Sequence, residues 1–378
     1  MIISMKKKIT YILWVLVLFA CNNVTSFQLK NGEKIDCSVI EDENFHLSSM
    51  ASIQTIVPLQ TNDSCLIGRI DKIEFFNDEV YVLDREYGVR LLVFDRNDGH
   101  FISSIGRMGK GPGEYVSICD FSIDKKKGLI YLLCNKNRLL VYSLSGEFQI
   151  SFAMDFYAAS MELKNDRIYF VRDERDNCNL VTTDLKGRIL HEEASPCDYG
   201  DSFVLLAHPF CHSGQNLLYR MFLNNIIYKI DKDGKLNGFY KVDFGEKEID
   251  INIIGKYTYE QLKREIANAR GKIKYLTAND HYLFLLFFDN NKPCISIYDK
   301  QNKEAHSYYY SNAKDDLVGL KQFPLLEYTT DKNEFVAILQ PSMLMDIKSG
   351  VQSTIGIRKI ELTDDMNPIL YILKTIEN

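Results

Sequence analysis

His208 and His212, with Cys211 beside them, form the densest group of metal-ligating residue types in the sequence. Two histidines four residues apart share one face of an α-helix and could hold zinc there. Pro209 argues against a helix at this point, because proline lacks an amide hydrogen and clashes with the preceding turn. The sequence therefore predicts no metal site at this pair and assigns no metal-ligating residues elsewhere.

The glycine-rich stretch Gly106–Tyr115 could bring backbone amides around a phosphate. It lacks the Lys-Ser/Thr pair of a phosphate-binding loop, and no helical pattern follows it. We interpret it as a shaped turn between two structural units. The G-x-S-x-G pattern of serine hydrolases is also absent, since Ser145-Gly146 and Ser349-Gly350 read as turns.

Carboxylates could hydrolyse a glycosidic bond or ligate calcium if they met at one point of the fold. Asp84, Glu114 and Asp289 are candidates for such a set. Spacing cannot show whether they converge, because they come from distant parts of the chain. An enzyme is therefore the alternative hypothesis, with no catalytic residue assigned and no cofactor predicted, calcium being left open.

The nine cysteines are scattered and lack the density of a disulfide scaffold. Cys119, Cys134 and Cys294 lie in or beside strand-like runs, where cysteine packs as a small apolar residue. Only Cys197 with Cys211 is predicted as a disulfide pair.

Composition favours an all-β protein that does not bind nucleic acid. Lys and Arg total 45 against 51 Asp and Glu, and no long basic run lies outside the N-terminus. The 22 tyrosines and 22 phenylalanines are residues that strands prefer.

The N-terminus predicts export. Three lysines, Lys6 to Lys8, precede an apolar run from Ile9 to Ala20 that is shorter than the roughly 20 residues needed to span a bilayer. Leu18-Phe19-Ala20-Cys21 resembles a bacterial lipobox, which implies a signal peptide over 1–20, a lipidated Cys21 and a tether over 21–48. We expect an outer-membrane lipoprotein, facing the periplasm rather than the cell surface; an ordinary secretory signal is the alternative.

A strand pattern repeats at intervals of about 45 residues, which is typical of propeller blades. In the first unit, Ile73 to Phe76, Val80 to Asp84, Leu91 to Asp95 and Phe101 to Ile105 read as four strands. Four similar units follow, and Leu325 to Tyr328, Glu334 to Leu339 and Met343 to Ile347 form an incomplete sixth.

The sequence thus predicts an all-β, six-bladed β-propeller over 49–378, closed by the N-terminal strand Ser52 to Leu59. A seventh blade is possible if 200–215 has been misread. A β-sandwich or two small barrels are the alternatives. Thr258 to Gln261 fits a capping box, so one short helical insertion is expected at about 256–272.

Gly109 to Tyr115 resembles the G-x-G-P-G-x-[FY] signature of NHL-type blades, and Phe121 to Asp124 and Leu139 to Gly146 follow its strand pattern. From about residue 50 to 350 the chain is similar to six-bladed propeller lipoproteins of Bacteroides-type bacteria. The signature occurs once, and the other blades match by pattern only.

Blade topology places long connections rich in side chains on one face of the ring. We predict that this face makes the protein a non-catalytic binding or scaffold module, anchored in the membrane, for a glycan, a peptide or an envelope protein. The candidate binding residues are Arg85, Tyr87, Arg90, Arg107, Lys110, Glu114, Tyr115, Arg138, Arg172 and Asp289.

Overall fold

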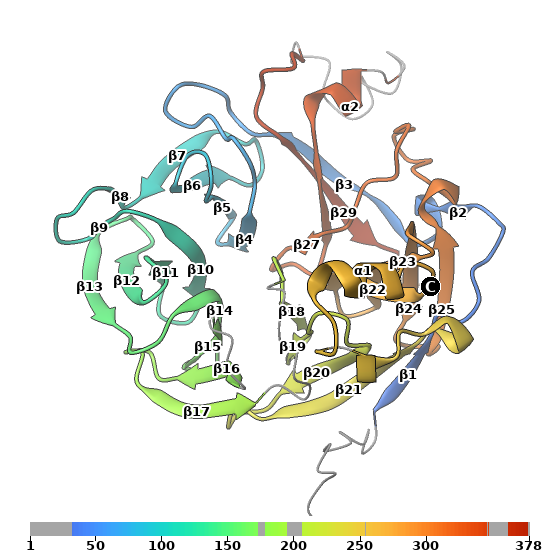
Figure 1. Cartoon of the computed structure of the whole chain (residues 1–378). Coiled ribbons are helices and arrows are strands. Elements are labelled where there is room, and N and C mark those ends of the chain that lie inside the picture. Colours follow the sequence, from blue (N-terminus) through green and yellow to red (C-terminus); the bar gives the residue numbers. More distant parts are fainter. Residues whose placement is uncertain are drawn as a thin grey trace, which may run out of the picture.

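Strands account for most of the described chain, and they form six blades around a central axis (Figure 1). The computed structural model describes residues 32–172, 178–194, 206–253, 255–345, 347 and 362–376. The predicted six-bladed β-propeller is confirmed for these residues.

In blades 1 to 5 the four strands follow one another in the chain, from the axis outward. Blades 1 to 3 are built from β4 (Lys72–Phe76), β5 (Glu79–Asp84), β6 (Arg90–Asp95), β7 (Phe101–Ile105), β10 (Ile118–Asp124), β11 (Leu129–Cys134), β12 (Arg138–Ser143), β13 (Phe148–Ala153), β14 (Ala158–Lys164), β15 (Arg167–Arg172), β16 (Cys178–Thr183) and β17 (Ile189–Ala194). Blades 4 and 5 are built from β18 (Phe210–Ser213), β19 (Asn216–Tyr219), β20 (Ile226–Ile230), β21 (Leu236–Asp243), β22 (Arg270–Ala278), β23 (Tyr282–Asp289), β24 (Lys292–Asp299) and β25 (Glu304–Tyr309).

Blade 6 closes the ring with strands from both ends of the described chain. Its order from the axis is β27 (Tyr328–Thr329), β28 (Phe335–Leu339), β29 (Ile369–Thr375) and β3 (Ala51–Pro58). β3 pairs antiparallel with β29, so the predicted N-terminal closing strand is confirmed.

The sequence-based prediction of a strand at Met343 to Ile347 is wrong. Pro341–Met345 forms the short helix α2, and the third strand of blade 6 is β29, further along the chain. A short, mainly apolar segment does not distinguish a strand from a buried helical turn, and Pro341 suits the first turn of a helix.

The chain before β3 packs along the outer edges of blades 4 and 5 and then pairs with a segment that follows blade 5. β1 (Glu33–Asp36) adds a parallel fifth strand to blade 4, Glu41 bridges to Tyr308 of blade 5, and β2 (Phe45–His46) pairs with β26 (Ala313–Lys314). Ile35, Cys37 and Leu47 are fully buried. The described part of the expected tether is therefore part of the folded body, while 1–31, with the predicted signal peptide and Cys21, lies outside the described residues.

Tight turns explain why the inner strands form hairpins. Asn77 and Asp78 have φ of 53° and 59°, and Asn165 and Asp166 have φ of 51° and 58°. Asn and Asp tolerate this left-handed conformation, which a two-residue hairpin turn needs at both positions.

The core is divided into six apolar clusters, one at each junction between neighbouring blades. At the junction that closes the ring, Val82 and Leu92 of blade 1 pack with Leu370 and Ile372 of blade 6. Burial of these side chains holds the blades together, at about 25 cal/mol per Å² of apolar surface.

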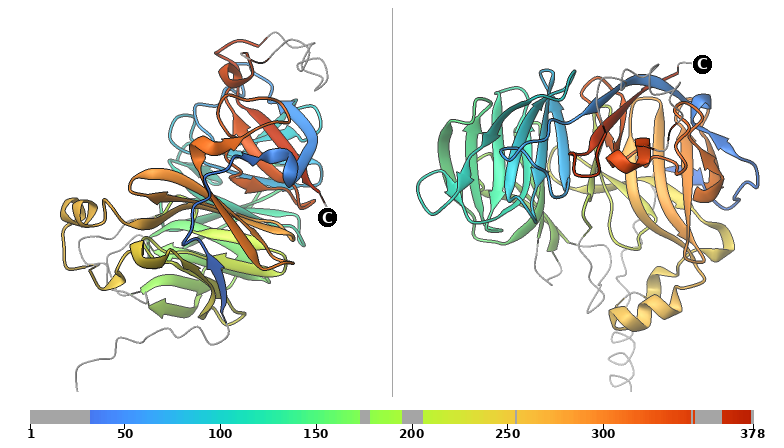
Figure 2. Two further views of the ribbon diagram at one scale, coloured as in Figure 1. Left: turned by 90° about the vertical axis from the view of Figure 1, so that its right-hand side faces the viewer. Right: turned by 90° about the horizontal axis from the view of Figure 1, so that it is seen from above.

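The predicted helical insertion is present as α1 (Tyr259–Glu265), between blades 4 and 5. Thr258 and Gln261 form the expected capping box, and Leu262 and Ile266 pack into the cluster between blades 3 and 4. Figure 2 shows α1 standing out from one face of the ring. No helix among the described residues is long and apolar enough to cross a membrane.

Two faces of the ring differ in their connections. The turn face carries the links between first and second and between third and fourth strands of each blade. The loop face carries the links between second and third strands and between blades. These links include α1 and the loop in which β8 (Arg107–Met108) pairs parallel with β9 (Glu114–Tyr115).

Candidate functional site

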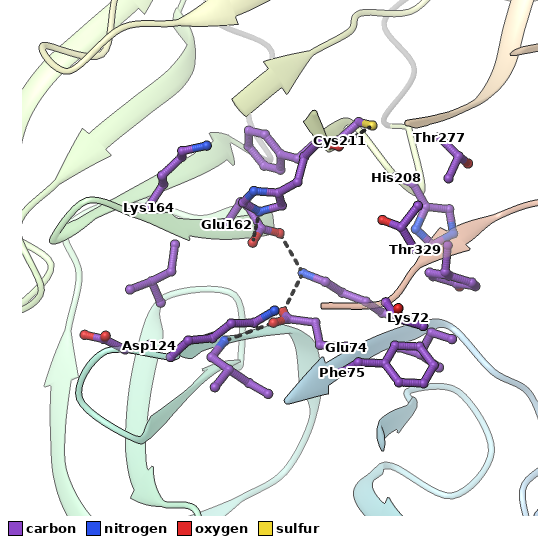
Figure 3. A pocket seen from close by; sticks show the side chains of 18 of the residues that line it. Lys72, Glu74, Phe75, Asp124, Glu162, Lys164, His208, Cys211, Thr277 and Thr329 are labelled. Atoms are coloured by element: carbon purple, nitrogen blue, oxygen red, sulfur yellow. Dashed lines mark hydrogen bonds and ion pairs between the residues drawn. The ribbon is translucent and has the colours of Figure 1, made fainter. Parts of the chain in front are cut away.

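A cavity of about 560 Å³ lies on the axis, at the turn face (Figure 3). It is lined by residues of the innermost strands, by residues just before β18 and β27, and by the turns after β10 and β14, so all six blades contribute. We call it the central cavity. The lining residues that carry the argument below are Lys72, Glu74, Lys125, Glu162, Lys164, His208, His212, Thr277 and Thr329.

The side chain of Lys72 organises one wall of the cavity. Its ammonium nitrogen lies 3.1 Å from Asp120 Oδ1, 3.1 Å from Glu162 Oε2 and 3.6 Å from Glu74 Oε1. It also donates a hydrogen bond of 2.7 Å to the carbonyl of Phe121. One cation from blade 1 thus holds carboxylates from blades 1, 2 and 3.

Further hydrogen bonds fix two of these carboxylates. Glu162 Oε1 lies 3.0 Å from His212 Nε2 and accepts a 3.0 Å hydrogen bond from the Ser122 hydroxyl. Asp120 accepts a 2.8 Å hydrogen bond from the Met161 amide. The wall is therefore a connected network, which we call the Lys72 network.

The network shifts the pKa values of its two glutamates in opposite directions. Burial and repulsion from Glu162 raise the pKa of Glu74 to about 7. Burial acts in the same direction on Glu162, but Lys72 and His212 outweigh it and lower the pKa of Glu162 below its ordinary value. Burial lowers the pKa of Lys72, but Asp120, Glu162 and Glu74 raise it above its ordinary value, so Lys72 stays charged.

The opposite wall is mainly aromatic, with the carboxyl group of Glu327 hydrogen-bonded to Tyr275 beside it. The His208 ring stacks on Tyr275 with centroids 6.0 Å apart and meets Tyr328 edge-on at 5.7 Å. Burial first, and then the charge of Arg220, lower the pKa of His208 to about 4. His208 is therefore neutral at physiological pH and can donate or accept one hydrogen bond on the cavity side.

Three buried polar atoms of the cavity lining have no hydrogen-bond partner among the described residues. They are Oγ1 of Thr277, a residue that is only 3% exposed, Oε1 of Glu74 and Oδ2 of Asp124. The two carboxylate oxygens still lie 3.6 Å and 3.5 Å from the ammonium groups of Lys72 and Lys127, so only Thr277 Oγ1 lacks any polar contact. A buried polar atom without a partner costs about 1–3 kcal/mol, which a bound polar molecule would recover.

None of the residues predicted from the sequence as binding residues lines the central cavity. Most form contacts on the loop-face side of the blades. Arg85 lies 3.5 Å from Asp71, Arg90 donates to the carbonyl of Ser64 at 3.2 Å, and Arg138 donates to Ser151 at 3.4 Å. Arg172 pairs with Glu192 at 2.8 Å.

The glycine-rich loop that contains β8 and β9 forms its polar contacts within itself. Glu114 pairs with Arg107 at 2.7 Å and accepts a 2.8 Å hydrogen bond from the Gly111 amide, so it occupies the position where a phosphate would bind. Tyr115 is 1% exposed and packs between blades 1 and 2. This geometry agrees with a shaped turn. Lys110 and Tyr87 are exposed, and their side chains have no hydrogen bond or ion pair in the described part of the chain.

Two candidate carboxylates of the enzyme hypothesis are bound within the fold. Asp84 is buried and accepts hydrogen bonds from the amides of Gly68 at 2.8 Å and Tyr87 at 3.2 Å. Asp289 lies 3.3 Å from Arg270 and accepts a 3.2 Å hydrogen bond from Tyr309. These carboxylates do not converge with Glu114 at the cavity.

His208 and His212 face different partners, since His212 contacts Glu162 and His208 contacts aromatic rings. Cys211 is buried and is a free thiol, with burial raising its pKa to about 12. Its predicted disulfide partner Cys197 lies outside the described residues, so that pairing stays a prediction.

Sequence reasoning missed the Lys72 network, although a signal for it exists. Glu74, Ser122 and Glu162 each stand three residues before the turn that ends the first strand of a repeat, within apolar runs. An isolated polar residue at the same position of successive innermost strands indicates a polar axis.

Six blades around one polar axial cavity define the protein as a six-bladed β-propeller with a polar cavity on its axis. The chain belongs to the family described as "Domain of unknown function (DUF4934)", whose model matches residues 32–374. No curated protein matches the sequence.

Two solved structures show the same fold. One, from Bacteroides fragilis NCTC 9343 and titled "Putative exported protein", is 19% identical, with a TM-score of 0.74 over 91% of this chain and 99% of that one. A member of the DUF4221 family from Bacteroides vulgatus is 9% identical, with a TM-score of 0.53 over 87% of this chain and 98% of that one. At these identities the likeness concerns the fold alone.

Proposed function

We propose that this protein is an exported, membrane-anchored binding module whose central cavity holds a saccharide. The observation that carries the proposal is the central cavity itself, where polar side chains from all six blades converge beside aromatic rings. Saccharides present hydroxyl groups and an apolar ring face, so they match a wall of Thr277 and His208 and a second wall of charged groups.

Binding is favoured over hydrolysis by the position of Lys72. A glycosidase needs two carboxyl groups separated by a gap of about 5–10 Å that admits the reacting carbon or a water. The Lys72 ammonium fills the space between Glu74 and Glu162, within 3.6 Å and 3.1 Å of their oxygens. The opposite pKa shifts of these glutamates favour an acid–base pair, but the gap that such a pair needs is occupied.

Export and lipidation are proposed from two observations. The N-terminus carries a lysine-led apolar run that ends at Cys21, and the structurally similar Bacteroides fragilis protein is titled as exported. Acyl chains on Cys21 would hold the propeller at a membrane without a spanning helix. We expect the outer membrane, with the propeller in the periplasm.

A peptide or envelope protein is the second candidate partner, and the loop face is the surface we assign to it. Tyr87 is 71% exposed there, and Met108 and Val116 are also exposed on neighbouring connections. Exposed aromatic and aliphatic side chains on loops are typical anchors for protein partners. Tyr87→Ala should weaken such a partner and leave saccharide binding unchanged.

The test is calorimetric titration of residues 22–378 with a panel of envelope and dietary oligosaccharides, followed by product analysis. We expect saturable binding without release of shorter products. Turnover of a bound saccharide would contradict the non-catalytic assignment, and binding that survives a cavity-filling Thr329→Trp substitution would contradict the assigned site.

A further inference from the structure

The charged side chains that line the central cavity fall into two sets. Each carboxyl group of the acidic set has at least one ion pair or hydrogen bond within the protein. Glu74 and Glu162 belong to the Lys72 network, and Glu327 is hydrogen-bonded to Tyr275. Asp124 accepts from the amides of the turn that follows it, and Asp166 pairs with Lys127.

The basic set is only partly engaged. Lys72 is held by three carboxylates, and Lys126 lies 4.0 Å from Asp166. Lys125 and Lys164 have no ion pair and no side-chain hydrogen bond among the described residues, although both line the cavity. The groups left available to a ligand are therefore cationic.

The two unengaged lysines lie on neighbouring blades. Lys125 begins the turn after β10 in blade 2, and Lys164 ends β14 in blade 3. Lys164 is half-buried, and burial lowers its pKa; attraction to Glu162 offsets only part of this effect, and repulsion from Lys229 adds to it. An anion placed beside Lys164 would remove this penalty.

The rest of the lining offers neutral hydrogen-bonding groups. The hydroxyl of Thr277 has no partner among the described residues, and His208 presents a neutral imidazole (Figure 3). Such groups fit sugar hydroxyls rather than further negative charge. The cavity thus has a cationic end and a neutral hydrogen-bonding end. These two ends match a ligand with a single acidic group on a polyhydroxylated ring.

We propose that the central cavity selects saccharides that carry a carboxylate, with Lys164 and Lys125 binding the carboxylate and Thr277 and His208 binding ring hydroxyls. This inference rests on the proposed function, because it specifies the ligand class of the same site. Lysine binds an anion as a point charge. The preference for acidic over neutral saccharides would therefore come from the charge and position of the two lysines rather than from a fixed bidentate geometry.

The test compares matched pairs of oligosaccharides by titration calorimetry on residues 22–378. Each pair differs only in a carboxylate against a hydroxymethyl group, as glucuronate against glucose and galacturonate against galactose. We expect the acidic member to bind at least about tenfold more tightly at low salt, as one charge-assisted hydrogen bond allows. The preference should shrink as ionic strength rises.

Two variants locate the effect. Lys164→Met should reduce the preference to about twofold or less, since it removes the half-buried cation and little volume. Lys186→Met is the matched control, because Lys186 is an exposed lysine of the same blade that does not line the cavity; it should keep the full preference.

The outcomes separate the two proposals. Equal or tighter binding of the neutral members, or an unchanged preference in Lys164→Met, would overturn the carboxylate inference and leave saccharide binding in place. If no member of either series binds, the saccharide function itself fails, and the inference fails with it.

Discussion

At the scale of single residues, the central cavity depends on Lys72. Its ammonium is the only cation within 4.0 Å of Glu74 and Asp120 among the described residues, and it shares Glu162 with His212. The side chain is 17% exposed, so little water is available to replace it as a partner for these carboxylates.

Lys72→Met therefore should destabilise the protein strongly. Removing one partner of a buried charge cluster typically costs about 3–5 kcal/mol, because the remaining carboxylates lose their counter-charge. Urea unfolding at pH 7 measures the loss. Lys164→Met is the control, since Lys164 has no ion pair to lose, and we expect a change within about 0.5 kcal/mol. Equal losses in both variants would show that Lys72 does not hold the network together.

Glu74 predicts a pH dependence of stability. The pKa of Glu74 is raised to about 7 in the folded protein. Its contribution to the free energy of unfolding is therefore complete at pH values below the pKa that it has in the unfolded chain, and this contribution is lost as pH rises through 7. Glu74→Gln removes this titration. The unfolding free energy of Glu74→Gln relative to the parent should therefore increase between pH 5 and pH 8, by about 1–3 kcal/mol.

Urea unfolding at pH 5, 6.5 and 8 tests this expectation. Glu304→Gln, at an exposed glutamate outside the cavity, serves as the control and should show no such trend. A difference between Glu74→Gln and the parent that stays constant from pH 5 to pH 8 would show that Glu74 does not titrate in this range.

The direction of individual side chains was the least predictable feature. Glu114 turns back onto Gly111, and Tyr115 packs between two blades, although both lie in a connection that looked exposed from the sequence. Such directions depend on contacts between blades that are distant in the chain. The ten predicted binding residues stay predictions for the loop face, since no ligand has been tested there.

At the scale of elements, the features that depend on a few neighbouring residues were predictable from the sequence. The turns at Asn77-Asp78 and Asn165-Asp166 and the capping box at Thr258 are set by a few neighbouring residues, so they could be read directly. β29 could not, because it lies far along the chain from β28, with which it pairs. The apolar run at Met343 was a better local match to a strand than to α2.

The closing strand β3 gives a prediction at this scale. Val57 is buried at the junction between blades 6 and 1, whereas Gln54 of the same strand is exposed. Val57→Asp places an unpaired charge in the core and should cost at least about 3 kcal/mol. Gln54→Asp should stay within about 0.5 kcal/mol. Urea unfolding measures the loss of stability in both variants. If Val57→Asp is as stable as the parent protein, closure of the ring through β3 is contradicted.

At the scale of the whole molecule, the propeller fold was predictable because its repeats are visible in the sequence. The location of the cavity was not. Connection length favoured the loop face, but the cavity lies at the turn face, since the polar residues of the innermost strands gather at the strand ends nearest the short turns. Loop length thus indicated the face with more loop side chains, but it did not indicate where the central cavity lies.

The proposed lipidation also belongs to the scale of the whole molecule. In the bacterial envelope, the parent protein should lose residues 1–20 and carry acyl chains on Cys21, and it should fractionate with membranes. Cys21→Ser should abolish labelling by a fatty-acid analogue, whereas Cys37→Ser, at a cysteine buried in the fold, should keep it. An unmodified mature N-terminus on the parent protein would contradict the anchor.

The measurement that tests the central claim most directly is a thermal-shift screen of saccharides against three forms of residues 22–378. These are the parent, Thr329→Trp in the cavity, and Tyr87→Ala on the loop face. A ligand at about 100 times its dissociation constant adds about 2.7 kcal/mol to stability. We predict a rise in Tm for the parent and Tyr87→Ala that is lost in Thr329→Trp, provided that this variant unfolds cooperatively without ligand. A rise that persists in Thr329→Trp and disappears in Tyr87→Ala would contradict the account and assign binding to the loop face.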